Sequence, residues 1–483
     1  MILPSTNITA EDASEVSQLK LTQSPKYAHH DYTRFLARST ALRNIEGIRG
    51  LLQYELQPGL ISLLAGKPNP TTFPIEEISL TLRSPTGPQP YQSSTSESAV
   101  VRETLTIKDG DIAKALQYTL TEGIPELRKL LSEYQKTEHG VNIDNIGLQL
   151  MMGSGSQDLL YKAFSSLLDP GDSILVEAPV YAGALAIIEP LEADIVEIQT
   201  DPSGVSISHL RSTLQSWPAG KRLPKLIYTT PFGCNPTGAT TAFERRKALL
   251  ELSEEYDFLI LEDDPYYYLY FGSNERPPSY LSLENTLIKN AEMGKRQRRV
   301  LRFDSFSKVL SSGMRVGFLT GPPALLEPIS SHTSAANLHS STTTQSMVLA
   351  ILKHWGRSGF HAHVYNICDF YRAKRDVFHE AMTKHFGNGL AEWTKPEAGL
   401  FFWFKLNLPP SKSDSYHLIR TKALAKGVLA VPGAAFYPSG RKSAYVRASF
   451  SLVDKQEADE ALRRLAEVVK EVITVDKAEG QQH

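Results

Sequence analysis

Lys308 is the residue whose type and position could do the most distinctive chemistry. It lies in the segment DSFSKVLSSGMRVGF, directly after a predicted strand. A lysine becomes a nucleophile when its surroundings suppress its charge, and against an aldehyde it forms a Schiff base. Ser305, Ser307 and Arg315 offer two hydroxyls and a guanidinium to a phosphate dianion. Taken alone, Lys308 is more simply interpreted as a surface lysine, so the chemical interpretation depends on other segments.

A second segment, GSGSQDLLYKAF, begins at Gly153 and leads from small residues directly into an amphipathic helix. The free N–H groups and the dipole of a helix N-terminus attract anions. Ser156 and Gln157 would present backbone and side-chain donors there. A plain helix cap after a flexible loop is the alternative interpretation.

A third segment, EDDPYYYLYF, follows the buried strand FLILED. We expect Asp264 at the carboxyl end of that strand, where a carboxylate could hold a protonated ring nitrogen. Tyr267 could donate a hydrogen bond to a ring hydroxyl oxygen. The alternative is a turn aspartate before Pro265 and an aromatic patch in the core. The tyrosines assigned to that patch are Tyr266, Tyr268 and Tyr270.

Three further residues follow or lie within predicted strands. Asn235, in TTPFGCNPTG, could donate to the same ring oxygen, although an Asn-Pro turn without a role is as reasonable. Tyr181, in EAPVYAGAL, could stack on a planar ring. Arg447, in SAYVRASFSLVD, points inward on a strand and therefore needs an anionic partner. That partner is either a substrate carboxylate, held by two parallel hydrogen bonds, or an internal carboxylate.

Short apolar runs alternate with helical patterns through the middle of the chain, which predicts a doubly wound α/β layer with a mostly parallel sheet. Ligands of such sheets collect at the carboxyl ends of the strands. Helices are expected from Gln157 and over Phe243–Tyr256. The predicted strands are Ser173–Glu177, Asp194–Ile198, Lys225–Thr230, Phe258–Asp263, Val300–Asp304 and Val316–Thr320.

The pattern of helical and strand-like segments changes near residue 356, and a smaller α+β domain is predicted over 356–475. A long helix over Phe360–Phe386 and helices at 414–426 and from 454 accompany its strands, Gly399–Leu406, Gly427–Gly433 and Ala444–Ser451. Before it we expect a flexible arm over 1–30, an N-terminal segment over 31–100 and the large domain over 101–355, with a tail over 476–483.

Two stretches are predicted to be loops, 83–98 and 274–299. The first is rich in Pro, Ser and Thr, and the second ends in the basic run KRQRR. A nuclear signal or an acidic partner would use such a run. A solvated loop before a strand is the simpler interpretation.

The bulk numbers exclude several classes of protein. A net charge of -2 gives no reason to expect nucleic acid or a membrane surface as partner. Two cysteines in 483 residues form no disulfide framework. The first residues have neither a secretory pattern nor an arginine-rich presequence, and no apolar run is long enough for a membrane span. We therefore expect a cytoplasmic protein, and no metal site is predicted.

In this order, the motifs resemble the fold-type I aminotransferases, which depend on pyridoxal phosphate (PLP). The sequences of these motifs are most similar to those of the kynurenine/α-aminoadipate and fungal aromatic amino-acid aminotransferases. The resemblance covers residues 30–475 apart from the two loops. Besides the segments above, it is carried by ISLLAGKPNPTTFP (Ile61–Pro74) and LQYTLTEGIPELR (Leu116–Arg128). It implies an α/β fold-type I transferase with a large doubly wound domain and a smaller α+β domain.

The resemblance also implies a role for each candidate residue. Lys308 would hold PLP as a Schiff base and move the proton between the substrate Cα and the cofactor. Asp264 would pair with the ring nitrogen, and Arg447 would bind the substrate carboxylate. The ring would be held by Asn235, Tyr267 and Tyr181, and the phosphate by Ser156, Gln157, Ser305, Ser307 and Arg315.

Family members share their active sites between two subunits, so a homodimer is implied, with Tyr118 reaching the neighbouring cofactor. Arg49 resembles an arginine that approaches the substrate side chain. One departure concerns Lys67, which stands where relatives have a glycine. A cation there would favour an acidic substrate or turn away to solvent.

The resemblance predicts ping-pong transfer of an amino group from an aromatic, kynurenine-like or aminoadipate-like L-amino acid to a 2-oxo acid such as 2-oxoglutarate. A PLP enzyme with a diverged reaction is the alternative, because the same scaffold supports other chemistry. A transcription regulator with an aminotransferase-like domain is more remote, since the matching segment begins near residue 30 and leaves no room for a DNA-binding module.

Overall fold

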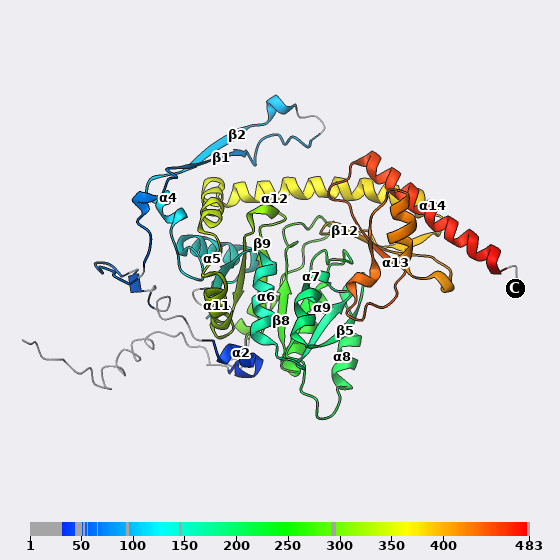
Figure 1. Ribbon diagram of the computed structural model, residues 1–483, viewed down its shortest axis with the longest axis horizontal. Coiled ribbons are helices and arrows are strands. Elements are labelled where there is room, and N and C mark those ends of the chain that lie inside the picture. The colour runs from blue at the N-terminus through cyan, green and yellow to red at the C-terminus, as the bar shows by residue number, and fades with distance from the viewer. Residues whose placement is uncertain are drawn as a thin grey trace, which may run out of the picture.

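The computed structural model describes residues 31–43, 51, 54–55, 57–64, 66–92, 96–143, 147–290 and 296–480, without the side chains of residue 98 and residues 477–480. Figure 1 shows two lobes, one around a large sheet and one around a small sheet, bridged by the long helix α12 (Thr342–Phe386). This helix breaks at Gly356, whose φ of 59° is not helical. The predicted domain boundary falls at this break, and the division into independent domains stays a prediction.

The large lobe is built on an eight-stranded sheet. Its core strands β9, β8, β7, β4 and β5 run parallel, and β10 is antiparallel to both of its neighbours. The prediction of a large, mostly parallel sheet is confirmed. In spatial order the strands are β3 (Gln149–Gly153), β10 (Gly317–Gly321), β9 (Val300–Ser305), β8 (Leu259–Asp263), β7 (Leu226–Thr229), β4 (Ser173–Ala178), β5 (Asp194–Asp201) and β6 (Gly204–Val205).

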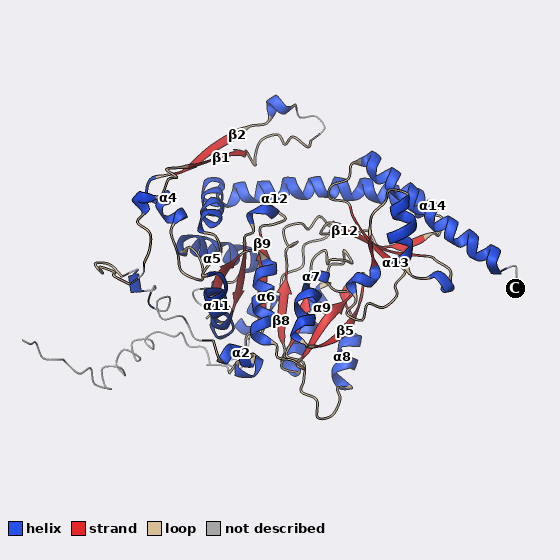
Figure 2. Cartoon of the chain, viewed as in Figure 1, coloured by secondary structure: helices blue, strands red, loops and turns tan. Residues whose placement is uncertain are grey.

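Helices cover both faces of this sheet, as Figure 2 shows. That is why the central strands are apolar on both sides. One face packs against α6 (Ser156–Leu167), α7 (Ala182–Ile188) and α11 (Pro323–Asn337). The other packs against α5 (Pro125–His139), α8 (Ile207–Gln215), α9 (Phe243–Glu255), α10 (Tyr280–Lys289) and α12.

The small lobe holds a four-stranded antiparallel sheet in the order β11 (Ala391–Trp393), β12 (Phe401–Leu406), β14 (Tyr445–Ser449) and β13 (Val431–Pro432). In β12 every second side chain is buried, and Phe402, Phe404 and Leu406 form the core. Accordingly Phe401 and Trp403 lie on the opposite face of the sheet. Helices α13 (Ser415–His417) and α14 (Lys455–Gly480) complete the lobe.

An antiparallel hairpin precedes the large lobe, which the sequence did not lead us to predict. It pairs β1 (Ile78–Arg83) with β2 (Arg102–Ile107), after the short helix α2 (Arg38–Ala41) and before α4 (Asp109–Leu116). The predicted 83–98 loop connects the two strands. It contacts α12, because Tyr91 lies 4.8 Å from Phe370 and Asn366 donates to the Pro85 carbonyl at 2.8 Å.

The prediction of a loop over 274–299 was partly wrong, because this stretch contains α10. Ser279 caps the helix by accepting a hydrogen bond from the Ser282 N–H. Two arginines of the basic run are also anchored inside the protein. Arg298 and Arg299 are both buried and pair with Glu284 and Asp257. These two side chains are therefore engaged within the chain.

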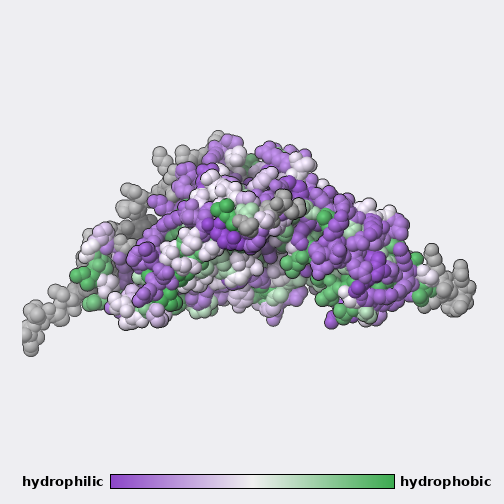
Figure 3. All heavy atoms as spheres, turned by 90° about the horizontal axis from the view of Figure 1, so that it is seen from above, coloured by the Kyte–Doolittle hydropathy of each residue, from purple (hydrophilic) through white to green (hydrophobic). Residues whose placement is uncertain are grey.

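No helix in the described ranges is long and apolar enough to cross a membrane. In the view of Figure 3 the surface is mainly hydrophilic, with apolar side chains gathered in small, separate patches.

Candidate active site

Three neighbouring strands meet at the start of α6 and form a cradle there. β3 and β9 end at this point, and the antiparallel strand β10 begins. The register places Gly317 beside both Gly153 and Ser305. A Cβ atom on Gly317 would lie 2.9 Å from the Ser156 nitrogen, and one on Gly155 would lie 2.4 Å from Arg315 Nη2. Only glycine lets the guanidinium and the helix N-terminus approach so closely. The cradle therefore combines a helix dipole with a fixed positive charge, which suits a phosphate.

The structure brings the predicted phosphate ligands together around this cradle. The Ser307 N–H donates to Ser305 Oγ at 3.1 Å, and Arg315 donates to Ser307 Oγ at 3.3 Å and to the Ser154 carbonyl at 3.2 Å. Gln157 differs from the prediction in one respect. Its side-chain amide donates to the Gly183 carbonyl at 2.9 Å, which leaves its backbone N–H in the first turn of α6 as the group for an anion.

Lys308 follows directly on these residues and is partly buried. Burial lowers the pKa of its amine, and the charge of Arg315 lowers it further. A larger fraction of the amine is therefore neutral at a given pH than for a free lysine, as nucleophilic attack on an aldehyde requires. Lys308 also lines a cavity whose walls include Tyr91, Trp355 and Tyr371.

The prediction for Asp264 was wrong, because the structure turns this side chain away from the site. Asp264 is buried and accepts a hydrogen bond from Arg302 Nη1 at 2.9 Å. Arg302 is fully buried and also pairs with Glu262 at 3.0 Å and Asp304 at 2.8 Å. Asp264 therefore belongs to a cluster of three carboxylates around one arginine.

Tyr267 was also wrongly assigned to the site. Its hydroxyl donates to the Glu138 carbonyl at 3.2 Å, and its ring lies under the guanidinium groups of Arg276 and Arg302, 3.8 Å and 4.8 Å from the ring centroid. Adjacent residues of a strand point to opposite faces, so Asp263 and Asp264 cannot serve the same side of β8.

Asp263 and Tyr266 occupy the positions predicted for Asp264 and Tyr267. Asp263 is buried, Tyr228 donates to its Oδ2 at 2.6 Å, and its Oδ1 has no hydrogen-bond partner among the described residues. Tyr266 is also buried, and the charges acting on it come from Asp263, Tyr181 and Arg447. The signal that we missed is the alternation of side chains along LILED (Leu259–Asp263). Glu262 and Asp264 share one face, and Arg302 on the next strand pairs with that face.

Arg447 and Asn235 meet where the two lobes face each other. Arg447 Nη1 donates to Asn235 Oδ1 at 2.8 Å, while its buried Nε has no partner in the described parts of the chain. Its guanidinium lies over the ring of Phe401 at 4.4 Å and that of Phe436 at 5.1 Å. These residues of the small lobe were not predicted. Arg447 has an amide partner rather than the carboxylate partner that the structural alternative required.

Tyr181 lies at the N-terminus of α7 and is half-buried. Burial raises the pKa of its hydroxyl, and the charges of Asp263, Arg447 and Arg315 also act on it. The predicted ring-stacking residue therefore lies within electrostatic range of Asp263, Arg447 and Arg315.

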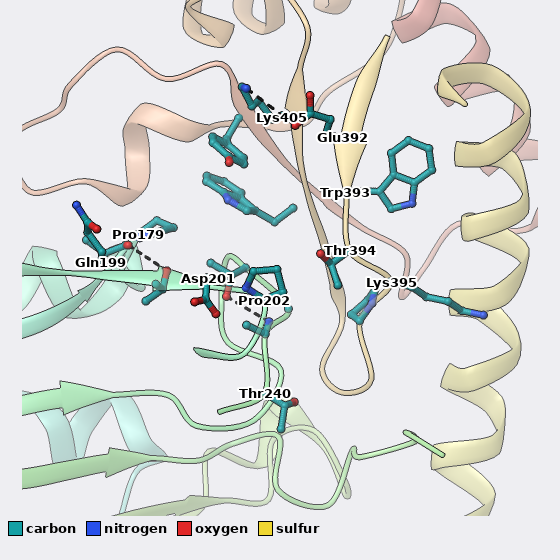
Figure 4. Close-up of a pocket in the computed structure, with 18 of the residues that line it drawn as sticks. Pro179, Gln199, Asp201, Pro202, Thr240, Glu392, Trp393, Thr394, Lys395 and Lys405 are labelled. Atoms are coloured by element: carbon teal, nitrogen blue, oxygen red, sulfur yellow. Dashed lines mark hydrogen bonds and ion pairs between the residues drawn. The ribbon is translucent and has the colours of Figure 1, made fainter. Parts of the chain in front are cut away.

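An open groove also lies between the lobes. Figure 4 shows Pro179, Gln199, Asp201 and Thr240 on the large-lobe side, facing the hairpin of β11 and β12 that carries Glu392 and Lys405. The groove also borders Thr237 and Gly238, which follow Asn235-Pro236 in the chain.

Two predicted residues, Tyr118 and Lys67, are not brought to this site within the chain. Tyr118 is 49% exposed and meets His339 edge-on at 5.9 Å. Lys67 forms an ion pair with Glu55, which also accepts a hydrogen bond from Ser62 at 2.5 Å. Arg49 lies outside the described residues.

Together the residues suit a planar ring that carries a phosphate and an aldehyde. The cradle matches the phosphate, and Lys308 matches the aldehyde. Among the described residues, Asp263 and Asp264 each have a buried Oδ1 without a partner, and a buried acceptor without a donor costs about 1–3 kcal/mol. The Oδ1 of Asp263 matches a protonated ring nitrogen, because Asp264 lies beside Arg302 instead.

Comparisons with known proteins agree with this chemistry. The family model "Aminotransferase class I and II" matches residues 88–465. The chain is 40% identical to the aminotransferase tdiD of Emericella nidulans over 87% of this chain and 92% of the relative. It is 38% identical to the mitochondrial kynurenine/alpha-aminoadipate aminotransferase of Mus musculus over 91% of this chain and 99% of the relative.

Among solved structures, the kynurenine aminotransferase of Pyrococcus horikoshii in complex with PMP aligns with a TM-score of 0.68 and 30% identity, over 91% of this chain and 98% of that one. A further aligned structure carries a phosphopyridoxyl amino acid. The chain belongs to the class I and II aminotransferases, of fold type I, and its cofactor is pyridoxal phosphate.

Proposed function

We propose that this aminotransferase moves the amino group of an aromatic or kynurenine-like L-amino acid to a 2-oxo acid, with 2-oxoglutarate as acceptor, by a ping-pong mechanism. The observation that carries the proposal is Lys308, whose amine has a lowered pKa and follows directly on the phosphate cradle. When bound, PLP supplies an electron-withdrawing ring that acidifies the substrate Cα–H.

We assign the remaining roles to the residues that meet at the site. Lys308 holds the cofactor and moves a proton to and from the substrate. Asp263 pairs with the ring nitrogen, and Tyr266 and Asn235 hold the ring oxygen. The flat face of Tyr181 covers the ring. Arg447 binds the substrate carboxylate. Its Nε, which has no partner among the described residues, supports this role, since a carboxylate can engage Nε together with a terminal nitrogen.

The Lys67–Glu55 ion pair supports a donor with an uncharged side chain. Glu55 neutralises the cation that replaces the glycine of relatives, so Lys67 itself offers no free positive charge to an acidic substrate. Relatives named for kynurenine, aminoadipate and aromatic substrates support the broader class. We also propose a cytoplasmic location for this chain, whereas some relatives are named as mitochondrial.

Lys308→Ala should remove the covalent anchor of the cofactor. We expect the purified wild-type protein to absorb visible light as a PLP enzyme and to release 2-oxo acids from aromatic donors when 2-oxoglutarate is present. The variant should fold normally, lose that absorption band and show no turnover. Products formed without any 2-oxo acid acceptor, or a colourless wild-type protein, would contradict the proposed reaction.

Neutralising each of the two neighbouring carboxylates should change kcat/KM to very different extents. Asp263→Asn removes the charge that faces the ring, so kcat/KM should fall about 100-fold or more, the scale of lost electrostatic stabilisation in an active site. Asp264→Asn is the matched control, since Arg302 keeps Glu262 and Asp304, and its kcat/KM should stay within about threefold of wild type. A larger loss in Asp264→Asn than in Asp263→Asn would restore the original assignment.

Glu55→Gln tests whether Lys67 reaches the substrate side chain. Freeing its charge should raise kcat/KM for aminoadipate or glutamate relative to phenylalanine, by about fivefold for an unscreened charge near a protein surface. The double variant Glu55→Gln with Lys67→Gln should return this ratio to the wild-type value. An unchanged ratio in Glu55→Gln would place Lys67 outside the side-chain pocket.

A homodimer is the last part of the proposal. Ile61 and Leu63 are 90% and 97% exposed in the isolated chain, as a segment that packs on a partner would be. Light scattering should give twice the mass of one chain. Tyr118→Phe should weaken PLP binding without changing that mass. A monomer with full activity would exclude the shared site.

A further inference from the structure

Tyr228 is a buried tyrosine whose hydroxyl contacts the proposed ring-binding carboxylate. It lies on β7, beside β8, and is 1% exposed. Its hydroxyl donates to Asp263 Oδ2 at 2.6 Å. Burial raises the pKa of Tyr228 well above the usual value, so the group remains a hydrogen-bond donor at every working pH. We propose that Tyr228 is a positioning residue for PLP, which fixes the Asp263 carboxylate with Oδ1 directed at the ring nitrogen.

The two oxygens of Asp263 are in different situations, and this difference carries the proposal. Oδ2 is held by Tyr228, while Oδ1 is buried without a partner among the described residues. A carboxylate held at one oxygen cannot swing about its last torsion without breaking that bond. The direction of Oδ1 is thus set before the cofactor binds, which lowers the entropy lost on binding.

The ring of Tyr228 gives the hydroxyl a fixed origin. It meets Phe164 of α6 edge-on at 5.7 Å, and both rings belong to the core cluster on that face of the sheet. The phenol is therefore rigid and attached to two packed elements, β7 and α6. Helix α6 also carries Ser156, so the phosphate cradle and the ring carboxylate are tied to the same helix.

Tyr228 also affects the charge of Asp263. Burial raises the pKa of this carboxyl to about 6, and the Tyr228 hydrogen bond opposes the rise. Without that bond the pKa would rise further, and more of the carboxyl would be protonated near neutral pH. A neutral carboxyl cannot hold a protonated ring nitrogen. The other charged or titratable groups that act with Asp263 are Arg302, Asp304, Tyr181, Tyr266 and Cys234.

Tyr228→Phe removes the hydroxyl and keeps the packed ring. Holoenzyme should be stripped of PLP and titrated with PLP while the visible absorption is recorded. We expect affinity to fall about 10-fold, equal to about 1.4 kcal/mol. The acidic limb of the kcat/KM profile should move to higher pH, because the ionised form of Asp263 is required and its pKa is raised.

Tyr134→Phe is the matched control. Tyr134 is buried to a similar degree, and its hydroxyl has no hydrogen-bond partner in the described ranges. Its variant should retain wild-type PLP affinity and pH profile. A Tyr228→Phe protein that is thermally destabilised as apoprotein, yet binds PLP and titrates like wild type, would reduce Tyr228 to a packing role and overturn the proposal.

A double variant separates this inference from the proposed role of Asp263, on which it rests. In the Asp263→Asn background, Tyr228→Phe should cause no further loss of PLP affinity. An additional 10-fold loss there would show that Tyr228 acts by another route and would contradict the proposal. If Asp263→Asn itself left PLP affinity and activity unchanged, the proposed role of Asp263 would be contradicted, and the role of Tyr228 that rests on it would fall with it. Should Tyr228→Phe not fold, Tyr228→His, which can still donate to Asp263, must bind PLP more tightly than Tyr228→Leu.

Discussion

The alternation of side chains along β8 is the constraint on which the site depends. It sends Glu262 and Asp263, the last two residues of the strand, to opposite faces of the sheet, and Asp264, which follows the strand, joins Glu262 at Arg302. One buried strand end thus carries carboxylates with different partners. Asp263 faces Tyr228 and the proposed ring position, whereas Asp264 faces Arg302. A register slip of one residue in this strand would exchange their surroundings and leave a charge without a partner on each face.

The Arg302 cluster explains how so many carboxylates can lie behind the site. Three of them pair with one fully buried guanidinium, and Gln135 adds a hydrogen bond to Asp304 at 2.9 Å. A buried charge without such partners costs several kcal/mol. Burial raises the pKa of Asp264 to about 7, so this carboxyl takes up a proton more readily than a free aspartate, which would relieve part of the excess negative charge. The cluster ties β8 to β9 and keeps the Asp263 end of β8 in place.

The sequence predicted most of the parallel sheet, because buried strands form apolar runs that are easily recognised. It also singled out the residues of the cradle, Lys308, Asn235 and Tyr181 near strand ends, and Arg447, which lies in the middle of β14. The errors have physical causes. Asp264 and Asp263 are adjacent, and only the pairing of Arg302 across strands distinguishes them. The hairpin β1–β2 is half-exposed and short in apolar residues. The contacts of Phe401 and Phe436 with Arg447 could not be predicted, because they depend on how the small lobe packs against the large one.

The contact between the lobes connects substrate binding to the position of the small lobe. Gly233, with φ +49°, lies so close to the backbone of Ala398 and Gly399 that a Cβ would be 2.5 Å from it. The Val180 N–H donates to the Phe436 carbonyl at 2.8 Å. These backbone contacts hold β12 and the turn before β14 against the strand ends. Arg447 then reaches Asn235 without moving the lobe. The guanidinium that we propose for the substrate carboxylate is therefore positioned by the same backbone contacts that join the lobes.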